Sequence, residues 1–166
     1  MTRRATASAS PRAVRPDPLI QVRDAEPFDE PGWRTLWRDY VRFYDAEVPE
    51  RVTAHTWARV LDPASPVDCL VAVAPGGERV VGFAVTVLHE GTWTDRPVCY
   101  LEDLFVAADM RGRGVARRLI ETLACRGRSR GWHRLYWQTH HDNAEARALY
   151  DQLARLTRFV RYDLDL

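Results

Sequence analysis

The pattern of apolar and polar residues predicts short strands and amphipathic helices that follow one another along the chain. Residues 19–23 alternate apolar and polar side chains, as a half-buried strand does. Aromatic and aliphatic residues then recur at helical spacing over 31–44, and Pro49 opens a shorter helix that ends at Leu61. The first third of the chain is therefore expected to form one strand and two helices.

The middle of the chain predicts two neighbouring strands. Residues 67–88 read VDCLVAVAPGGERVVGFAVTVL, two apolar runs on either side of Pro75-Gly76-Gly77. A Pro-Gly-Gly sequence is typical of a tight turn, and the runs beside it have the length of strands. This segment is expected to form an antiparallel hairpin.

Strands and helices alternate in the rest of the chain. We expect strands at 98–106, 134–139 and 159–164, and helices at 114–125 and 143–153. The strands at 98–106 and 134–139 should be parallel neighbours, because a helix connects them in a βαβ unit. The predicted fold is α/β, with a mixed, mostly antiparallel sheet, a central βαβ unit and flanking helices.

Length and composition predict one globular domain. The chain has 166 residues, 46% hydrophobic and 28% charged, enough to bury an ordinary core. Residues 1–18 are rich in Arg, Ser, Ala and Pro and are expected to be a disordered tail before a domain at 19–166. A transit peptide has a similar composition, but Pro11 and Pro16 would interrupt its amphipathic helix. No apolar run reaches the roughly 18 residues that a membrane helix needs, so no membrane association is expected.

Charge is distributed unevenly along the chain, although the net charge is only +1. Residues 24–50 hold eight acidic residues against three arginines, whereas 111–130 hold seven arginines against one glutamate. The two segments could therefore serve ligands of opposite charge. Without residues 1–18, which carry four arginines and one aspartate, the net charge is −2, and nucleic-acid binding is not expected.

Neither the cysteines nor the histidines predict a metal site. Cys69, Cys99 and Cys125 are widely spaced and form no C-x-x-C pair, so neither a disulfide framework nor a zinc site is expected. Three reduced thiols favour a cytoplasmic location. His140-His141-Asp142 lies in a predicted loop and lacks the helical spacing of paired histidine ligands.

A glycine-rich loop between a predicted strand and a predicted helix is a candidate phosphate site. Its sequence is Arg111-Gly112-Arg113-Gly114-Val115-Ala116. Glycines let the backbone approach a ligand closely, and the first turn of a helix presents N–H groups to an anion. Residue 117 is Arg, so this is not a dinucleotide fingerprint, and no G-K-[ST] follows as in a P-loop. A purely structural turn is the alternative, but it does not explain the arginines around the glycines.

The loop also carries a family resemblance. Arg111-x-x-Gly114-x-Ala116 matches the [QR]-x-x-G-x-[GA] acetyl-CoA motif of the GNAT superfamily of N-acetyltransferases. The segments LEDLFV before it and NAEARALYDQLA after it resemble the diamine and histone-type branch, so the likeness runs from Val98 to the C-terminus. Arg158 departs from the pattern, because many members have a glycine in the turn before the last strand.

The resemblance implies a GNAT-like fold and acetyl-CoA as co-substrate. The edges of the parallel strand pair would splay apart to admit the pantetheine arm. The residues implied in cofactor binding are Phe105, Val106, Arg111, Gly112, Arg113, Gly114, Val115, Ala116 and Asn143.

Tyr150 is a candidate general acid. From its helical spacing alone, the simplest interpretation is an aromatic residue of the core. The resemblance favours the other role, because a tyrosine in the Leu-Tyr pair of this helix commonly protonates the leaving thiolate in the family. Asn143 lies two turns earlier on the same face, where it could cap the helix and also contact the cofactor.

Two adjacent carboxylates lie in the predicted strand 98–106. Neighbouring side chains of a strand point to opposite faces, so Glu102 and Asp103 would need separate roles unless a bulge intervenes. An amine acceptor is protonated at neutral pH and must lose a proton before it attacks. By resemblance, Glu102 is the possible base. Asp103 is a candidate for binding the substrate's cation, and a structural hydrogen bond is equally compatible with its position.

Together these residues predict an acetyl-CoA-dependent N-acetyltransferase that acts on a primary amine, in a cationic small molecule or a protein. The amine would attack directly in a ternary complex, without a metal. A noncatalytic acyl-CoA-binding module is the alternative, and the presence of both Tyr150 and Glu102 favours the enzyme. The protein could form a homodimer.

Overall fold

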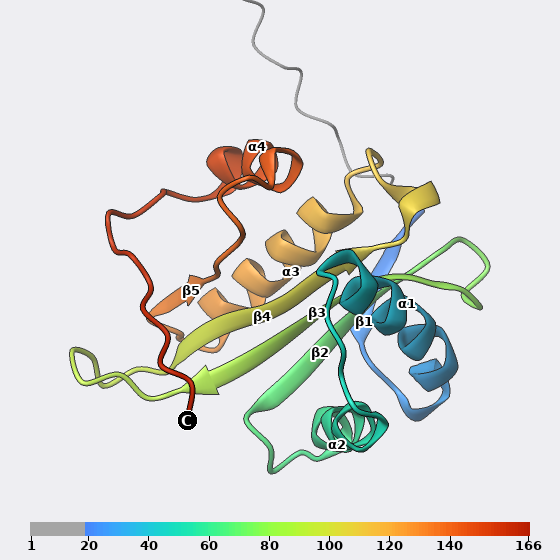
Figure 1. Cartoon of the computed structure of the whole chain (residues 1–166), viewed down its shortest axis with the longest axis horizontal. Coiled ribbons are helices and arrows are strands. Elements are labelled where there is room, and N and C mark those ends of the chain that lie inside the picture. The colour runs from blue at the N-terminus through green and yellow to red at the C-terminus, as the bar shows by residue number, and fades with distance from the viewer. Residues whose placement is uncertain (1–18) are drawn as a thin grey trace, which may run out of the picture. The chain divides into compact units, whose positions relative to one another are not determined.

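The computed structural model describes residues 19–166, and the predicted tail at 1–18 lies outside them. The chain divides into two compact units, Met1–Tyr136 and Trp137–Leu166, and each is considered by itself (Figure 1). None of the helices among the described residues combines the length and the apolar character needed to cross a membrane.

The first unit contains the sheet and three α-helices. In chain order its elements are β1 (Gln21–Asp24), η1 (Pro27–Asp29), α1 (Glu30–Phe43), α2 (Glu50–Leu61), β2 (Val67–Val73), β3 (Val80–His89), β4 (Val98–Val106), η2 (Ala108–Met110), α3 (Val115–Ser129) and β5 (Arg134–Tyr136). The strands lie in sequence order, β1-β2-β3-β4-β5, and every neighbouring pair is antiparallel except β4 and β5. The predicted mixed α/β fold and its parallel pair are confirmed.

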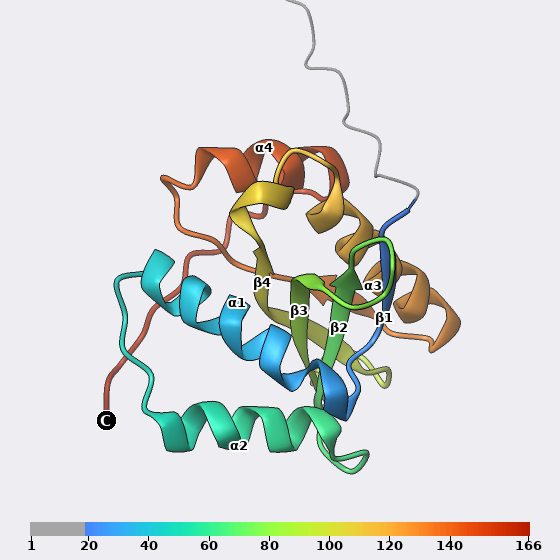
Figure 2. The same cartoon turned by 90° about the vertical axis from the view of Figure 1, so that its right-hand side faces the viewer.

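The two faces of the sheet bury different helices. Phe83 on β3 contacts the ring of Trp33 in α1, with centroids 6.2 Å apart. A Cβ on the preceding residue, Gly82, would lie 3.2 Å from Cγ1 of Val115, the first residue of α3. Since neighbouring strand residues point to opposite faces, α1 and α3 cover opposite sides of the sheet. Figure 2 shows α1 and α2 together on one side and α3 on the other.

An aromatic cluster forms the core between α1, α2 and the sheet. Trp33 is completely buried, and its ring lies 5.2 Å from Trp37 and 4.9 Å from Trp57 of α2. The indole N–H of Trp37 donates to the hydroxyl of Thr53 at 3.1 Å, which joins the two helices. The helical spacing seen in the sequence therefore describes the face of α1 that packs on β3.

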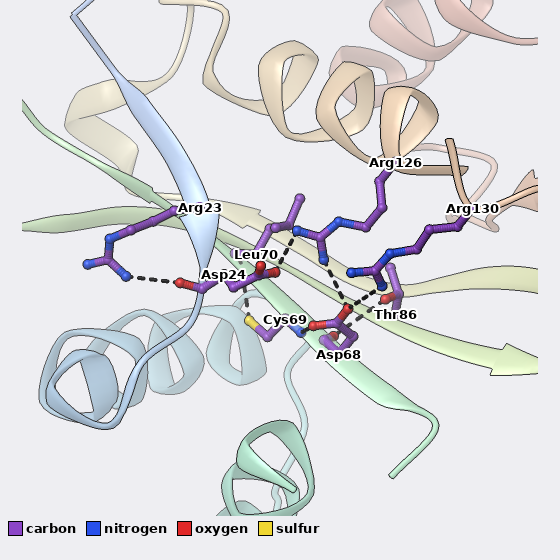
Figure 3. Close-up of polar contacts among 8 residues, drawn as sticks. All are labelled: Arg23, Asp24, Asp68, Cys69, Leu70, Thr86, Arg126 and Arg130. Carbon is purple, nitrogen blue, oxygen red and sulfur yellow. Dashed lines mark hydrogen bonds and ion pairs between the residues drawn. The ribbon is translucent and has the colours of Figure 1, made fainter. Parts of the chain in front are cut away.

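Ion pairs attach the C-terminal part of α3 to the far strands of the sheet (Figure 3). The guanidinium of Arg126 bonds to Asp24 of β1 at 2.5 Å and to Asp68 of β2 at 3.0 Å. Arg130 lies 3.8 Å from the same Asp68 carboxylate. These bonds hold one helix against two strands that are not its neighbours in the sequence.

The second unit contains α4 (Ala144–Leu153). The predicted strand at 159–164 is wrong, because residues 154–166 form no strand. The side chains of this segment are exposed, with exposed fractions of 93% for Phe159 and 90% for Tyr162. Alternation of apolar residues gives a strand one apolar face, but a strand also needs a partner for its backbone, and residues 137–166 offer none.

Three boundaries of the predicted elements differ from the structure by two residues or more. The first strand begins at Gln21 instead of Leu19, and β5 ends at Tyr136 instead of Thr139. Helix α3 continues four residues beyond Cys125, to Ser129. Trp132 follows this helix and packs on it where residue 127 is a glycine: a Cβ there would come within 2.7 Å of the Trp132 ring.

Candidate functional site

The glycine-rich loop has the geometry of an anion site. Gly112 and Gly114 have φ of +69° and +77°, a conformation that other residues rarely adopt. Gly114 caps α3 and its carbonyl accepts from the N–H of Arg118 at 3.0 Å, the first bond of the helix. The N–H groups of Val115 and Ala116 precede that bond and have no acceptor within the helix. They are placed to bind phosphate oxygens.

Contacts on both sides hold the loop in place. Before it, Met110 is buried, and Asp109 accepts two hydrogen bonds from Arg79 at 2.8 and 2.9 Å. This hydrogen bonding lowers the pKa of Asp109. After the loop, Val115 is buried against β3 where Gly82 leaves room for it. The end of β4 and the start of α3 are thus fixed relative to the sheet.

The strand pairing beside the loop stops early. β5 pairs only with Val98–Tyr100, so within the first unit the remaining residues of β4 have no strand neighbour on that side. Phe105 and Val106, both predicted to bind the cofactor, belong to this uncovered part. Their side chains are mostly buried, so a ligand lying along this open edge would meet mainly their backbone.

A β-bulge in β4 brings the two predicted carboxylates into one environment. Val85 of β3 pairs with Asp103, but the next residue, Thr86, pairs with Leu101, so Glu102 is the extra residue. The expectation of opposite faces therefore does not apply here. Glu102 is exposed and close enough for its charge to raise the pKa of Asp103.

Asp103 lies against α1, where the phenol of Tyr40 hydrogen-bonds to it. Burial raises the pKa of Asp103 from 3.8 to about 6, and the hydrogen bond from Tyr40 limits the rise. The pKa of Tyr40 is raised as well, mainly by burial and then by the charge of Asp103. At neutral pH the site thus holds a carboxylate beside a protonated phenol.

Aromatic rings extend from this carboxylate towards the glycine-rich loop. Tyr40 lies 5.8 Å from Phe105 and 5.2 Å from Tyr44. The guanidinium of Arg111 lies 5.5 Å above the Phe105 ring and 5.8 Å from Phe43 at the end of α1. The structure therefore places Asp103, Phe105 and Arg111 along one wall of the first unit.

No single residue of α1 was among the predicted site residues. Tyr40 is one of the apolar positions at helical spacing over 31–44, and the structure places it beside Asp103 and Phe105. One signal was available: α1 ends with aromatic residues at 40, 43 and 44, and the last two are about half exposed. A helix that only packed on a sheet would not need exposed aromatic side chains at its end.

Ion pairs reduce the acidic excess predicted for residues 24–50. Asp24 and Asp29 pair with Arg126 and Arg23, both outside the segment. Further pairs form within it: Glu30 with Arg34, Asp39 with Arg42, and Glu50 with Arg34. The number of acidic residues in the sequence therefore overstates the negative electrostatic field on the α1 side of the first unit.

The second unit holds the remaining two predicted site residues. The side-chain oxygen of Asn143 accepts from the N–H of Ala146 at 3.2 Å, and its amide donates to the hydroxyl of Thr139 at 3.2 Å. The predicted helix cap is confirmed. Tyr150 lies seven residues along α4, half-buried, with its ring 5.3 Å from Trp137 in an edge-to-face arrangement.

The buried cysteines are poorly suited to carry an acyl group. Cys69 and Cys99 are buried, and burial raises the pKa of both thiols, that of Cys99 to about 11. A thiol is nucleophilic as its thiolate, which these environments disfavour. Cys125 is exposed on α3, three turns beyond the loop.

Three polar side chains meet in the loop before α4. His141 bonds to Asp142 at 2.8 Å, His140 lies 3.6 Å from the same carboxylate, and all three are exposed. The side chains are within reach of a shared ion, but nothing buries or orients them for one.

Comparisons with known proteins agree with this geometry. The model of the acetyltransferase (GNAT) family matches residues 32–154. The D-amino-acid N-acetyltransferase HPA3 of Saccharomyces cerevisiae is 35% identical over 143 residues, which cover 86% of this chain and 89% of that protein. The thialysine N-epsilon-acetyltransferase of Mus musculus is 42% identical over 62 residues, 34% of this chain and 36% of that protein.

Solved structures share the fold at lower sequence identity. A probable acetyltransferase superposes with a TM-score of 0.78 at 20% identity, covering 88% of this chain and 97% of that one. An aminoglycoside acetyltransferase from an uncultured soil metagenomic sample gives a TM-score of 0.76 at 17% identity, covering 90% and 98%.

Proposed function

Because the chain belongs to the acetyltransferase (GNAT) family of acetyl-CoA-dependent N-acetyltransferases, we propose that it acetylates the primary amine of a cationic small molecule or a protein by direct attack in a ternary complex. Glu102 and Asp103 receive the amine and its proton, and Tyr150 protonates the leaving thiolate. The family membership bears out the resemblance expected from the loop motif.

The observation that carries the proposal is the pair of carboxylates at the bulge of β4. An alkylammonium has a pKa of about 10.4, so an acceptor arrives charged and must be deprotonated. Asp103, with a pKa of about 6, is a stronger base than an ordinary aspartate and is still ionised at pH 7. Glu102 adds a second, exposed negative charge that attracts the ammonium. The base is therefore Asp103 or Glu102, and the two share one site.

Acetyl-CoA is held, in this proposal, by the glycine-rich loop and the uncovered edge of β4. The N–H groups at the start of α3 bind phosphate oxygens, and the nearby arginines complete the charge balance. The edge of β4 at Phe105 and Val106 is open to the amide groups of the pantetheine arm, because β5 does not extend along it; the carbonyl of Val106 is already bonded to Arg111. By its resemblance to the family, Asn143 is also proposed to bind the cofactor.

The chemical step needs no covalent intermediate on the protein. The neutral amine attacks the thioester carbonyl carbon, the C–N bond forms, and the C–S bond then breaks. A carboxylate takes the proton from nitrogen, and the Tyr150 phenol gives one to sulfur. A phenol of pKa about 10 is suited to protonate a thiolate whose acid has a pKa of about 8.5. The raised thiol pKa of the buried cysteines supports direct attack over transfer through a cysteine.

The similarity to HPA3 suggests which acceptor to test first. HPA3, 35% identical over most of its length, is a D-amino-acid N-acetyltransferase, so a free amino acid is the acceptor to test first. Its amine would meet Asp103 and Glu102.

A thiol-release assay tests the proposal. The full chain is given acetyl-CoA and a panel of D- and L-amino acids, a diamine and a peptide with a free amino terminus, and the acetylated product is identified by mass spectrometry. We expect release above the blank with at least one amine, and its loss in a Glu102→Gln/Asp103→Asn variant. Acetyl-CoA binding by calorimetry with no release for any amine would instead identify a noncatalytic acyl-CoA-binding module.

A further inference from the structure

Arg111 has an arrangement that the phosphate loop does not explain. Its side chain does not extend over the start of α3 but folds back along the end of β4, where Nε donates to the carbonyl oxygen of Val106 at 3.3 Å. Its guanidinium lies over the rings of Phe105 and Phe43. The backbone N–H of Arg111 is also engaged, by the carbonyl of Ala108 at 3.4 Å.

This conformation leaves the outer edge of a fixed guanidinium available. Among residues 19–166, none supplies a hydrogen bond or an ion pair to the Nη atoms of Arg111. Other arginines near the loop differ: Arg79 is bonded to Asp109 through both Nη atoms, and Arg117 pairs with Glu121. An arginine held through Nε and by aromatic faces presents two parallel donors, which is the geometry that binds a carboxylate or a phosphate.

The same wall holds the opposite charge a short distance away. Asp103 and Phe105 are two residues apart on β4 and both contact Tyr40 of α1, so they share a face of the sheet. Positions 103 and 105 are about 7 Å apart along the strand, and the Arg111 guanidinium lies 5.5 Å from the Phe105 ring. A free amino acid carries its ammonium and carboxylate groups on one carbon, and with a hydrogen bond of about 2.8 Å at each end it bridges about 8 to 9 Å.

We propose that Arg111 binds the carboxylate of an amino acid acceptor whose amine is directed at Asp103, and so makes the enzyme selective for free amino acids over simple amines. This rests on the proposed function and names the substrate class of that site. Phe105 forms the floor between the two charges, and the exposed ring of Phe43 borders the carboxylate end.

A phosphate of acetyl-CoA is the other oxyanion that could occupy Arg111. The conformation favours the acceptor, because the guanidinium is directed to the α1 wall while the loop N–H groups lie at the start of α3. The two ligands predict different kinetics: loss of a carboxylate contact raises the KM of the acceptor, and loss of a phosphate contact raises the KM of acetyl-CoA.

The test compares an amino acid with the same molecule lacking its carboxylate, in wild type and in Arg111→Gln. We expect kcat/KM for the amino acid to fall by about 10- to 100-fold, the scale of a lost charge-assisted pair. The decarboxylated amine should change less than about threefold, as should the KM of acetyl-CoA. Arg111→Lys keeps the charge but not the paired donors. Its kcat/KM for the amino acid should lie between the values for the wild type and Arg111→Gln. Arg128→Gln, an exposed arginine elsewhere on α3, should leave both acceptors unchanged.

Three results would overturn the inference, and they are separable. An increase in the KM of acetyl-CoA with an unchanged ratio between the two acceptors would assign Arg111 to the phosphates. If the wild-type enzyme acetylates only amines without a carboxylate, the proposed function stands, but its acceptor is not an amino acid. Absence of thiol release with every amine would refute the proposed function itself. Thermal unfolding of the variants checks that each is folded.

Discussion

At the scale of single residues, the environment of Asp103 makes a pH-dependent prediction. Its pKa of about 6 reflects burial, opposed by the hydrogen bond from Tyr40. If the ionised form takes the amine's proton, kcat/KM for the acceptor should rise as the pH passes through about 6. Tyr40→Phe removes the bond that lowers the pKa of Asp103, so the rise should move to higher pH. A pH–rate profile at saturating acetyl-CoA measures both.

Asp103→Asn provides the control, in activity and in stability. The activity profile should lose its limb near pH 6. A buried carboxyl with a raised pKa binds its proton more tightly in the folded state than in the unfolded one. The wild type should therefore lose stability as the pH rises from about 4 to about 6, and Asp103→Asn should lose less. An unchanged activity limb in this variant would assign the limb to another group.

Tyr150 makes a second prediction at this scale. Tyr150→Phe preserves the edge-to-face contact with Trp137 while removing the hydroxyl. As general acid, Tyr150 should account for a fall in kcat of roughly 10²-fold on substitution, with acetyl-CoA affinity little changed. Single-turnover kinetics and calorimetry measure the two quantities. A variant that works at the wild-type rate would show that Tyr150 serves only to pack α4.

At the scale of elements, the conformation of the loop before α3 should control cofactor binding. Gly114 has a φ of +77°, whereas proline requires a φ near −65° and has no N–H. Gly114→Pro should therefore weaken acetyl-CoA binding at least tenfold, as measured by calorimetry. Gly131→Ala is the matched control, since Gly131 has a φ of +72° with open space around it, beyond the other end of α3. If both variants bind acetyl-CoA like the wild type, the loop is only a connection.

The ion pairs of Arg126 make a prediction about the stability of the same helix (Figure 3). The side chain is 14% exposed, and it bridges two strands. Arg126→Met keeps the aliphatic stem but leaves Asp68 with the longer contact to Arg130 and the hydrogen bond from the N–H of Cys69. We expect a loss of about 1 to 2 kcal/mol of unfolding free energy, between the values for exposed and buried pairs. Urea denaturation measures it, and Arg128→Met, on the exposed side of α3, should cost much less.

At the scale of the whole molecule, the distribution of paired and unpaired charge predicts the response to salt. Five of the eight acids of residues 24–50 pair with arginines, two of which lie outside the segment. The glycine-rich loop, which we propose receives the polyanion, includes the exposed Arg113. The KM of acetyl-CoA should therefore increase more than the KM of an amine acceptor between about 50 and 500 mM salt, since exposed charges are screened over about 10 Å at 0.1 M. The reverse order would show that the acidic segment acts as a whole on the acceptor.

Most elements of the fold and the glycine-rich loop could be predicted from the sequence. Periodicity over ten or more residues predicted α1, Pro49 predicted the start of α2, and the Pro-Gly-Gly turn located the hairpin. The loop at 111–116 was recognisable because its requirement is local: glycines at positive φ just before a helix. Such features depend on residues that are covalent neighbours, so a linear pattern is sufficient to reveal them.

Tertiary structure decided how the site is assembled. The bulge at Glu102 is a property of the register between β3 and β4, and it cannot be seen in either strand alone. Burial raises the pKa of Asp103, and the bond that limits this rise comes from Tyr40, in a helix far away in the sequence. The Arg111 guanidinium lies near Phe43, at the end of the same helix. The alternating segment at 159–164 forms no strand for the same reason. Pairing, burial and charge compensation require contact between distant parts of the chain, and only the folded molecule specifies which parts meet.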